Sequence, residues 1–218
     1  MNTDILSDVL RAARLKGAVF FHVEAASPWV AEAPPSANLA LLVMPGAQHV
    51  IEYHVLTAGS CWIQLVDDDS QPIRMDSGSV VVFPQGDPHV MSSAPGMRAV
   101  PDLSGFDQPN RTPPFYIKQN GGGPERTTMI CGFLGCDTLP FNPLIQSLPR
   151  VIHVPGAYNA ADGWLGMLIE TAARETRGRR AGSESVLANI SELMFVEVVR
   201  RYMASIPGEG SGWLRALN

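Results

Sequence analysis

The residues best suited to carry chemistry lie in the stretch GSVVVFPQGDPHVM, from Gly78 to Met91. An apolar strand pattern of three valines and a phenylalanine runs into Pro84 and Gly86, which favour a tight turn. Asp87-Pro88 stiffens the chain that follows, so the turn fixes His89 at the start of the next strand. An imidazole held in this way suits a metal ligand, a catalyst or a packed core residue, and the stretch alone leaves these alternatives open.

A second group of candidates lies on the segments EYHVLTAG and RTTMICGFLGC. Glu52 and His54 are two residues apart and therefore share one face of a strand. Two histidines and two cysteine thiolates make a closed tetrahedral zinc site. The sequence offers such a set, which we take as the predicted zinc ligands: His54, His89, Cys131 and Cys136.

The spacing of the two cysteines sets a condition on that zinc site. Cys131 and Cys136 are five residues apart, so on a regular strand their side chains face opposite ways. A bulge or turn at Gly132 or Gly135 would be needed to bring both sulfurs to one spot. The alternative is that the cysteines act as small buried hydrophobic residues and that His54 is a hydrogen-bonded pocket residue.

The elements around these residues begin with a region of short strands. Segments rich in Val, Ile, Phe and Tyr, separated by turns, predict strands at AVFFHVEA, NLALLVM, HVIEYHVLTAG, SCWIQLV, SVVVFP and RTTMICGFLG. Many short strands with this spacing predict an antiparallel sandwich or barrel. Residues 92–127 are rich in Pro, Gly, Asn and Ser, and we expect a long loop there, either a lid or a disordered segment.

Helical patterns flank the strand region. Apolar residues recur with the period of a helix over residues 4–15, 159–176 and 183–205. The last segment is apolar on nearly all sides, and a helix of that kind is buried on two faces. One face can pack on the sheet, and the other needs a second helix or a partner chain. For a partner chain, we expect the exposed contacts to be Met194, Phe195, Val198 and Tyr202.

Charge and cysteine usage limit the partners. The 218 residues carry a net charge of −5, which argues against a nucleic-acid-binding surface on this chain. Three cysteines, an N-terminus unlike an export signal and no apolar run of membrane length indicate a cytoplasmic protein with reduced thiols and no membrane partner.

Two of the stretches resemble the motifs of the cupin superfamily. The spacing Gly78-x5-Pro84-x-Gly86-x2-His89 matches the second cupin motif, except that Ser93 stands in place of its final Asn. In the first motif, Glu52-x6-Gly59 supplies the acid and the glycine, but the His-x-His pair is missing. The resemblance therefore does not carry over the usual iron or manganese site of three histidines and one acid.

Over nearly its whole length, from residue 5 to 217, the chain resembles the cupin-type N-terminal domain of AraC-family transcriptional regulators. The resemblance rests on the order and spacing of the blocks YHVLTAGSCWIQL, GSVVVFPQGDPHVM, GGGPERTTMICGFLGCD, FNPLIQSLPRVIHV and GWLRAL. It implies a mainly β protein with α, in which a cupin-like antiparallel jelly-roll barrel is followed by a C-terminal helical pair. It also implies that the barrel senses a small-molecule effector, that the chain forms a homodimer, and that DNA is bound only by a following helix-turn-helix half.

The expected divisions follow from that resemblance. Residues 1–157 form the sensor barrel with its N-terminal helix, and residues 158–206 form the helical dimerisation segment. Residues 207–218 begin a linker to a DNA-binding half, before which we expect this sequence to be truncated.

A jelly roll of this size can enclose a ligand among inward-facing side chains. By alternation along the strands, the expected lining is Glu52, His54, Trp62, Gln64, Phe83 and His89. The alternative for Trp62 and Phe83 is core packing, and for Glu52 it is a position facing solvent.

Three functions compete at this point. The first is an effector-sensing and dimerisation domain, which is not an enzyme. The second is a metal-dependent cupin enzyme, an oxygenase or isomerase, and the third is a purely structural dimerisation unit with a filled barrel.

Overall fold

The computed structural model describes residues 6–7, 15–69, 71–104, 114–136, 143–156, 163–178 and 180–206. Most of the expected helix at 4–15 and all of the expected linker at 207–218 lie outside the described residues. No helix in the described ranges is long and apolar enough to cross a membrane.

The larger of two sheets has the strand order β10-β6-β3-β9-β1-β8. Its strands are β1 (Lys16–Ala26), β3 (His49–Ala58), β6 (Val80–Phe83), β8 (Phe115–Asn120), β9 (Arg126–Cys136) and β10 (Ile152–Val154). Neighbouring strands are antiparallel, except that β8 runs parallel to β1. This parallel edge pair is a departure from the expected antiparallel barrel.

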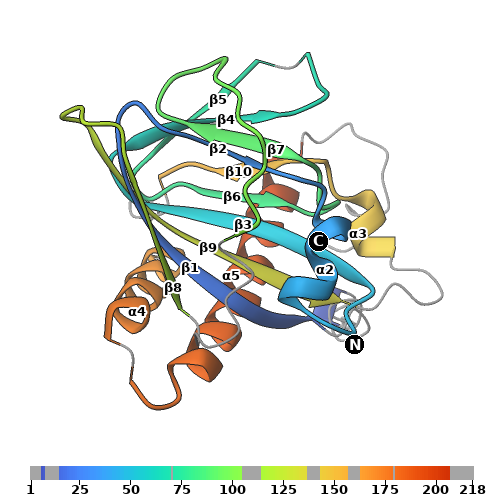
Figure 1. Cartoon of the computed structure of the whole chain (residues 1–218). Coiled ribbons are helices and arrows are strands. Elements are labelled where there is room, and N and C mark those ends of the chain that lie inside the picture. Colours follow the sequence, from blue (N-terminus) through green and yellow to red (C-terminus); the bar gives the residue numbers. More distant parts are fainter. Residues whose placement is uncertain are drawn as a thin grey trace.

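The smaller sheet has the order β2-β7-β4-β5 and is antiparallel throughout. Its strands are β2 (Val30–Ala33), β4 (Ser60–Leu65), β5 (Ile73–Asp76) and β7 (His89–Ser92). The two sheets face each other across a core that both supply, for example Leu56 and Val81 against Ile63 and Met91. Figure 1 shows the sheets stacked in this way. The cupin-like jelly roll with C-terminal helices is confirmed, as two facing open sheets rather than a closed barrel.

The outer face of the six-stranded sheet is covered by α4 (Trp164–Gly178) and α5 (Ser183–Ser205), as expected from the helical patterns (Figure 1). Met194, Phe195 and Val198 of α5 are buried against the sheet, and Tyr202 is half-buried beside them. The expectation that these residues lie free for a partner chain is therefore wrong. The outer face of the sheet is itself strongly apolar, and α4 packs against α5, so one chain buries both apolar sides of the helix.

Two expectations for shorter elements also fail. Residues 38–44 were expected as a strand, but residues 38–43 belong to α2 (Ser36–Val43) and Met44 is its C-cap. The apolar run is too short to separate strand from helix by period, and its Leu and Ala residues favour a helix. Strand β8 lies inside the expected loop of residues 92–127, and α3 (Pro143–Ser147) follows β9.

Candidate functional site

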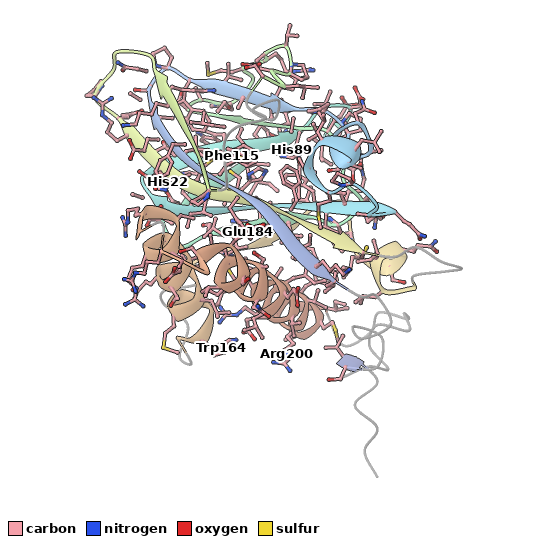
Figure 2. All side chains as sticks on the ribbon, turned by 60° about the horizontal axis from the view of Figure 1, so that its bottom comes forward. His22, His89, Phe115, Trp164, Glu184 and Arg200 are labelled. Atoms are coloured by element: carbon pink, nitrogen blue, oxygen red, sulfur yellow. The ribbon has the colours of Figure 1, made fainter. Side chains whose placement is uncertain are left out.

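A cavity of about 340 Å³ lies between the two sheets. Most of its wall is apolar or aromatic, with Phe21, Trp29, Met91, Met129 and Phe133 among the lining residues. One part of the wall is polar, and there Glu52, His54 and His89 meet beside Cys131. Figure 2 places His89 in the interior between the sheets, away from the helices α4 (Trp164–Gly178) and α5 (Ser183–Ser205).

Strand β3 supplies two of the three polar groups. Glu52 and His54 alternate with Ile51, Tyr53 and Val55, whose side chains pack on the helical side of the sheet. The expectation that Glu52 and His54 share one face therefore holds in the geometry, and that face is the interior. Both side chains are at least nine-tenths buried.

The turn between β6 and β7 positions His89, the third polar group. The chain leaves the six-stranded sheet at Phe83, turns, and enters the four-stranded sheet at His89. Gly86 has a positive φ of 69° there, and a Cβ at this position would come within 2.7 Å of Ser36. The Pro-x-Gly turn thus takes the chain from the six-stranded sheet to the four-stranded sheet. It places the His89 ring against the ring of His54.

The two histidines are linked directly. His54 Nε2 and His89 Nε2 are 2.8 Å apart, and His89 Nδ1 donates to the backbone carbonyl of Asp87 at 2.9 Å. The ring of Phe83 stacks on His89 with centroids 3.7 Å apart and an angle of 8° between planes. Backbone and aromatic contacts therefore fix the His89 ring in one orientation.

Burial keeps these groups uncharged. It raises the pKa of Glu52 to about 8, and it lowers the pKa of His89 to about 4. The pKa of His54 is also lowered well below its usual value, first by burial and then by the neighbouring His89. The 3.6 Å separation of His89 Nδ1 and Glu52 Oε2 is accordingly not an ion pair, because His89 is neutral and donates elsewhere.

These three side chains form a possible metal-binding group, since one ligand atom from each lies within 4.8 Å of the others. The donors fit a metal ion in type: two imidazoles and a carboxylate are common ligands. His89 also donates the hydrogen of its other ring nitrogen, Nδ1, to the Asp87 carbonyl, as metal-bound histidines usually do. Both Glu52 Oε2 and His54 Nδ1 lack a hydrogen-bond partner in the described part of the chain.

The four predicted zinc ligands are not brought together. Cys131 lines the cavity and is the cross-strand neighbour of His54, but Cys136 packs in the core under the helices. The pairing of β9 with β3 is unbroken from Met129 to Cys136, so no bulge reverses the alternation. The bulge or turn that would bring the sulfurs of Cys131 and Cys136 to one spot is therefore not present in β9.

The expected cavity lining is met in part. Glu52, His54 and His89 line the cavity, and Phe83 is fully buried behind His89. Trp62 and Gln64 do not line it, because Cys61, Ile63 and Leu65 are the inward residues of β4. Phe21 and Val23 also line the cavity and were not predicted, although the alternation in AVFFHVEA identifies them once the inward face of β1 is known.

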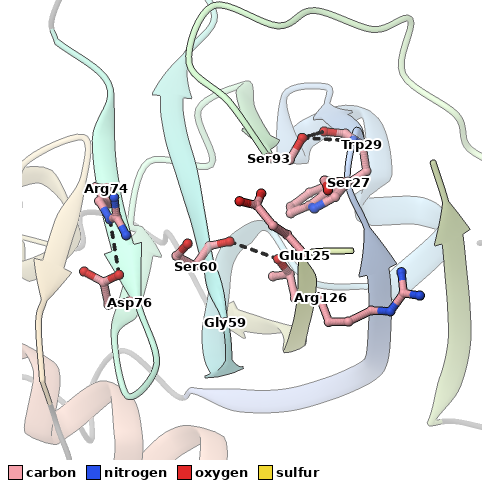
Figure 3. Close-up of a pocket in the computed structure, with 10 residues that line it drawn as sticks. Ser27, Trp29, Gly59, Ser60, Arg74, Asp76, Ser93, Glu125 and Arg126 are labelled. Atoms are coloured by element: carbon pink, nitrogen blue, oxygen red, sulfur yellow. Dashed lines mark hydrogen bonds and ion pairs between the residues drawn. The ribbon is translucent and has the colours of Figure 1, made fainter. Parts of the chain in front are cut away.

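A second hollow, of about 380 Å³, lies at the sheet edge near Gly59 and Arg126 (Figure 3). Its polar groups are largely paired with one another: Arg74 with Asp76 at 3.2 Å, and Thr127 Oγ1 with the Ser60 carbonyl at 2.9 Å. Arg74 and Asp76 are well exposed to solvent. The cavity between the sheets, with its unpaired buried groups, is therefore the stronger candidate site.

The chain is similar in sequence to a cupin family model and to transcriptional regulators. A family model described as cupin matches residues 4–204. An HTH-type transcriptional regulator of Haemophilus influenzae is 26% identical over 153 residues, which cover 68% of this chain and 45% of that protein. A protein of Streptomyces antibioticus named as an AraC-like transcription regulator is 24% identical over 177 residues, covering 78% and 54%.

Among solved structures, a ToxT variant from Vibrio cholerae in its apo form is similar, with a TM-score of 0.41 and 10% identity. That similarity covers 84% of this chain and 56% of the other. The chain spans about half the length of the curated relatives it matches.

Proposed function

Since the chain belongs to the cupin family, we propose that it is the effector-sensing and dimerisation domain of an AraC-type transcription regulator. The effector site is the cavity between the two sheets. The names of the relatives support a regulator rather than an enzyme. On this proposal the chain works in the cytoplasm as a homodimer, and DNA is contacted by another part of the regulator, in keeping with the net charge of −5 here.

The observation that carries the proposal is an apolar cavity whose wall includes Glu52 and His54, each with a buried polar atom that has no hydrogen-bond partner among the described residues. Buried polar groups without partners cost roughly 1–3 kcal/mol each, so a fold that keeps them there favours a ligand that satisfies them. A filled interior would have favoured a purely structural dimerisation unit instead.

A contact behind the cavity supports signalling to the helices. Tyr53 lies between Glu52 and His54 on β3 but points to the other face, where its hydroxyl is 2.6 Å from Ser191 Oγ of α5. Ser191 donates its own proton to the Leu187 carbonyl, so Tyr53 is the donor to Ser191. A shift of β3 on effector binding would therefore move the Tyr53 hydroxyl and change its hydrogen bond to Ser191 of α5.

The proposal is tested by a thermal-shift screen of small molecules, because a ligand that binds only the folded state raises the melting temperature. Val23→Trp fills the cavity from β1, and Gln64→Trp places the same side chain on the outer face of β4. We expect hits to stabilise the parent and Gln64→Trp but not Val23→Trp. A screen with no hits, or hits that stabilise Val23→Trp equally, would count against the proposal.

A second candidate property is zinc binding, now by Glu52, His54 and His89 in place of the four-ligand set. Three protein ligands would leave the metal an open position towards the cavity, where it could act as a Lewis acid for a bound molecule. The same site would serve the alternative of a cupin oxygenase or isomerase. Elemental analysis of protein purified without a metal-affinity tag tests the metal: about one equivalent of zinc in the parent and none in His89→Ala supports it.

A further inference from the structure

The cavity between the sheets reaches the surface along one side of the molecule, where each sheet has an edge strand. Strand β8 is an edge of the larger sheet, and β2 is an edge of the smaller one. Both strands line the cavity, for example through Ala31 of β2, which is exposed to solvent, and Ile117 of β8. The two strands do not pair with each other, so the cavity opens between them unless another segment covers the gap.

The segment that covers this gap is formed by residues 97–104, which we call the strap. Strand β7 ends at Ser92 in the smaller sheet, and β8 begins at Phe115 in the larger sheet, so the chain between them has to cross from one sheet to the other. Figure 1 shows the strap, in bright green, passing from the smaller sheet towards the larger one. Five strap residues line the cavity: Ala99, Val100, Asp102, Leu103 and Ser104.

One ion pair fixes the start of the strap to β2. Arg98 donates to both carboxylate oxygens of Glu32, from Nε to Oε2 at 2.8 Å and from Nη2 to Oε1 at 2.9 Å. The backbone N–H of Ala99 donates to Oε2 as well, at 3.2 Å. The Glu32 side chain is only 8% exposed, whereas that of Arg98 is 57% exposed. Because the carboxylate is largely buried and accepts two parallel bonds, this pair holds the strap more firmly than an ordinary surface pair.

The rest of the strap is held by few contacts. Leu103 packs, partly buried, against an apolar cluster that includes Phe21 and Leu39. Val100 is 87% exposed, and the bond from the Ser104 N–H to Asp102 Oδ1 lies within the strap itself. No backbone–backbone hydrogen bond joins the strap to a strand in the described part of the chain. The strap can therefore swing away without breaking either sheet.

We propose that the strap is the entry gate of the effector cavity and that Arg98 and Glu32 are the latch that keeps it closed. The proposal rests on the proposed function in naming the effector as the molecule that passes between β2 and β8. Because strap residues form part of the cavity wall, an effector that fills the cavity contacts them and favours the closed position.

Two cysteines report separately on gate opening and on global unfolding. Cys131 lines the cavity, so a thiol reagent reaches it through the gate, whereas Cys136 packs under the helices and is reached when the fold opens. The labelling rate of each with N-ethylmaleimide is measured on EDTA-treated protein, and the labelled residue is located by fragment mass spectrometry. We expect Arg98→Met to raise the rate at Cys131 roughly fivefold or more and to leave Cys136 nearly unchanged.

Arg74→Met is the matched control, because Arg74 is similarly exposed and pairs with Asp76 outside the cavity. This variant should change neither rate. Glu32→Gln breaks the same latch as Arg98→Met, so the double variant should label Cys131 no faster than the faster single variant. Equal Cys131 rates in the parent and Arg98→Met, fully additive effects, or a parallel rise at Cys136 would overturn the gate.

The parent protein alone decides the question if the latch variants fail to fold. Sodium chloride at about 1 M screens the exposed guanidinium and should raise the labelling rate at Cys131 several-fold without a rise at Cys136. No effect of salt at Cys131 would overturn the latch. That result would leave the effector cavity standing, because the thermal-shift screen with Val23→Trp does not depend on the strap.

Discussion

Glu52 carries a buried carboxyl group whose protonation differs between the folded and unfolded chain. Its pKa is about 8 in the fold, whereas an unfolded carboxyl ionises near its ordinary value of 4.5. Between these values the folded state holds a proton that the unfolded state has lost. The free energy of unfolding of the metal-free, effector-free protein therefore falls as pH rises through this window.

We predict how the free energy of unfolding changes between pH 7 and pH 8. The lowered pKa values of His54 and His89 place their effect at lower pH, so Glu52 dominates here. We expect the parent to lose about 1 kcal/mol of stability over this interval, and Glu52→Gln to lose much less. Urea denaturation after EDTA treatment measures this, with Glu24→Gln as the control. Equal losses in the parent and Glu52→Gln would contradict the raised pKa.

Strand β3 joins the cavity to the helical layer. A double-mutant cycle of Tyr53→Phe and Ser191→Ala tests the contact, because it isolates the hydrogen bond between their hydroxyls. We expect each single variant to cost about 1 kcal/mol and the pair to be non-additive by a similar amount. Full additivity would show that the two elements are not coupled there.

Gly132 has a related role on the neighbouring strand. A Cβ at this position would overlap the Tyr53 hydroxyl, so the glycine makes room for the Tyr53 ring. From the sequence, a bulge or turn was one possible role for this glycine. The need for a small residue came instead from a side chain on the paired strand, which local sequence does not reveal.

Individual strands show how much of the site the sequence could predict. The Pro84-x-Gly86 turn fixed the position of His89, and the period of two placed Glu52 and His54 together. The same period divides the β4 residues into two faces but does not show which face is inward. Trp62 and Gln64 were predicted to face inward, whereas the structure places them on the outer face. Only the pairing of Leu65 with His89 across β4 and β7 decides that question, and pairing is set by the whole fold.

At the scale of the whole molecule, the helical layer is the surface we propose for the homodimer. The exposed large apolar side chains of α4 and α5 are Trp164, Met167, Val186 and Leu193. Figure 2 shows Trp164 on the outer side of this layer. These residues replace the buried Met194, Phe195 and Val198 as the candidate contacts.

Sedimentation equilibrium tests the dimer. We expect Leu193→Lys to weaken association roughly tenfold or more, because it places a charge in an apolar contact. Leu41→Lys on α2 is the matched control, since Leu41 is also exposed but lies on a different element. A parent that stays monomeric at high micromolar concentration would rule this interface out.

The central claim is that an effector binds between the two sheets, and a crystal structure with a hit from the thermal-shift screen tests it most directly. We expect ligand density in the cavity, with a donor atom within hydrogen-bond distance of Glu52 Oε2 or His54 Nδ1. Density in the hollow beside Arg74 and Arg126, with the cavity between the sheets unchanged, would contradict it.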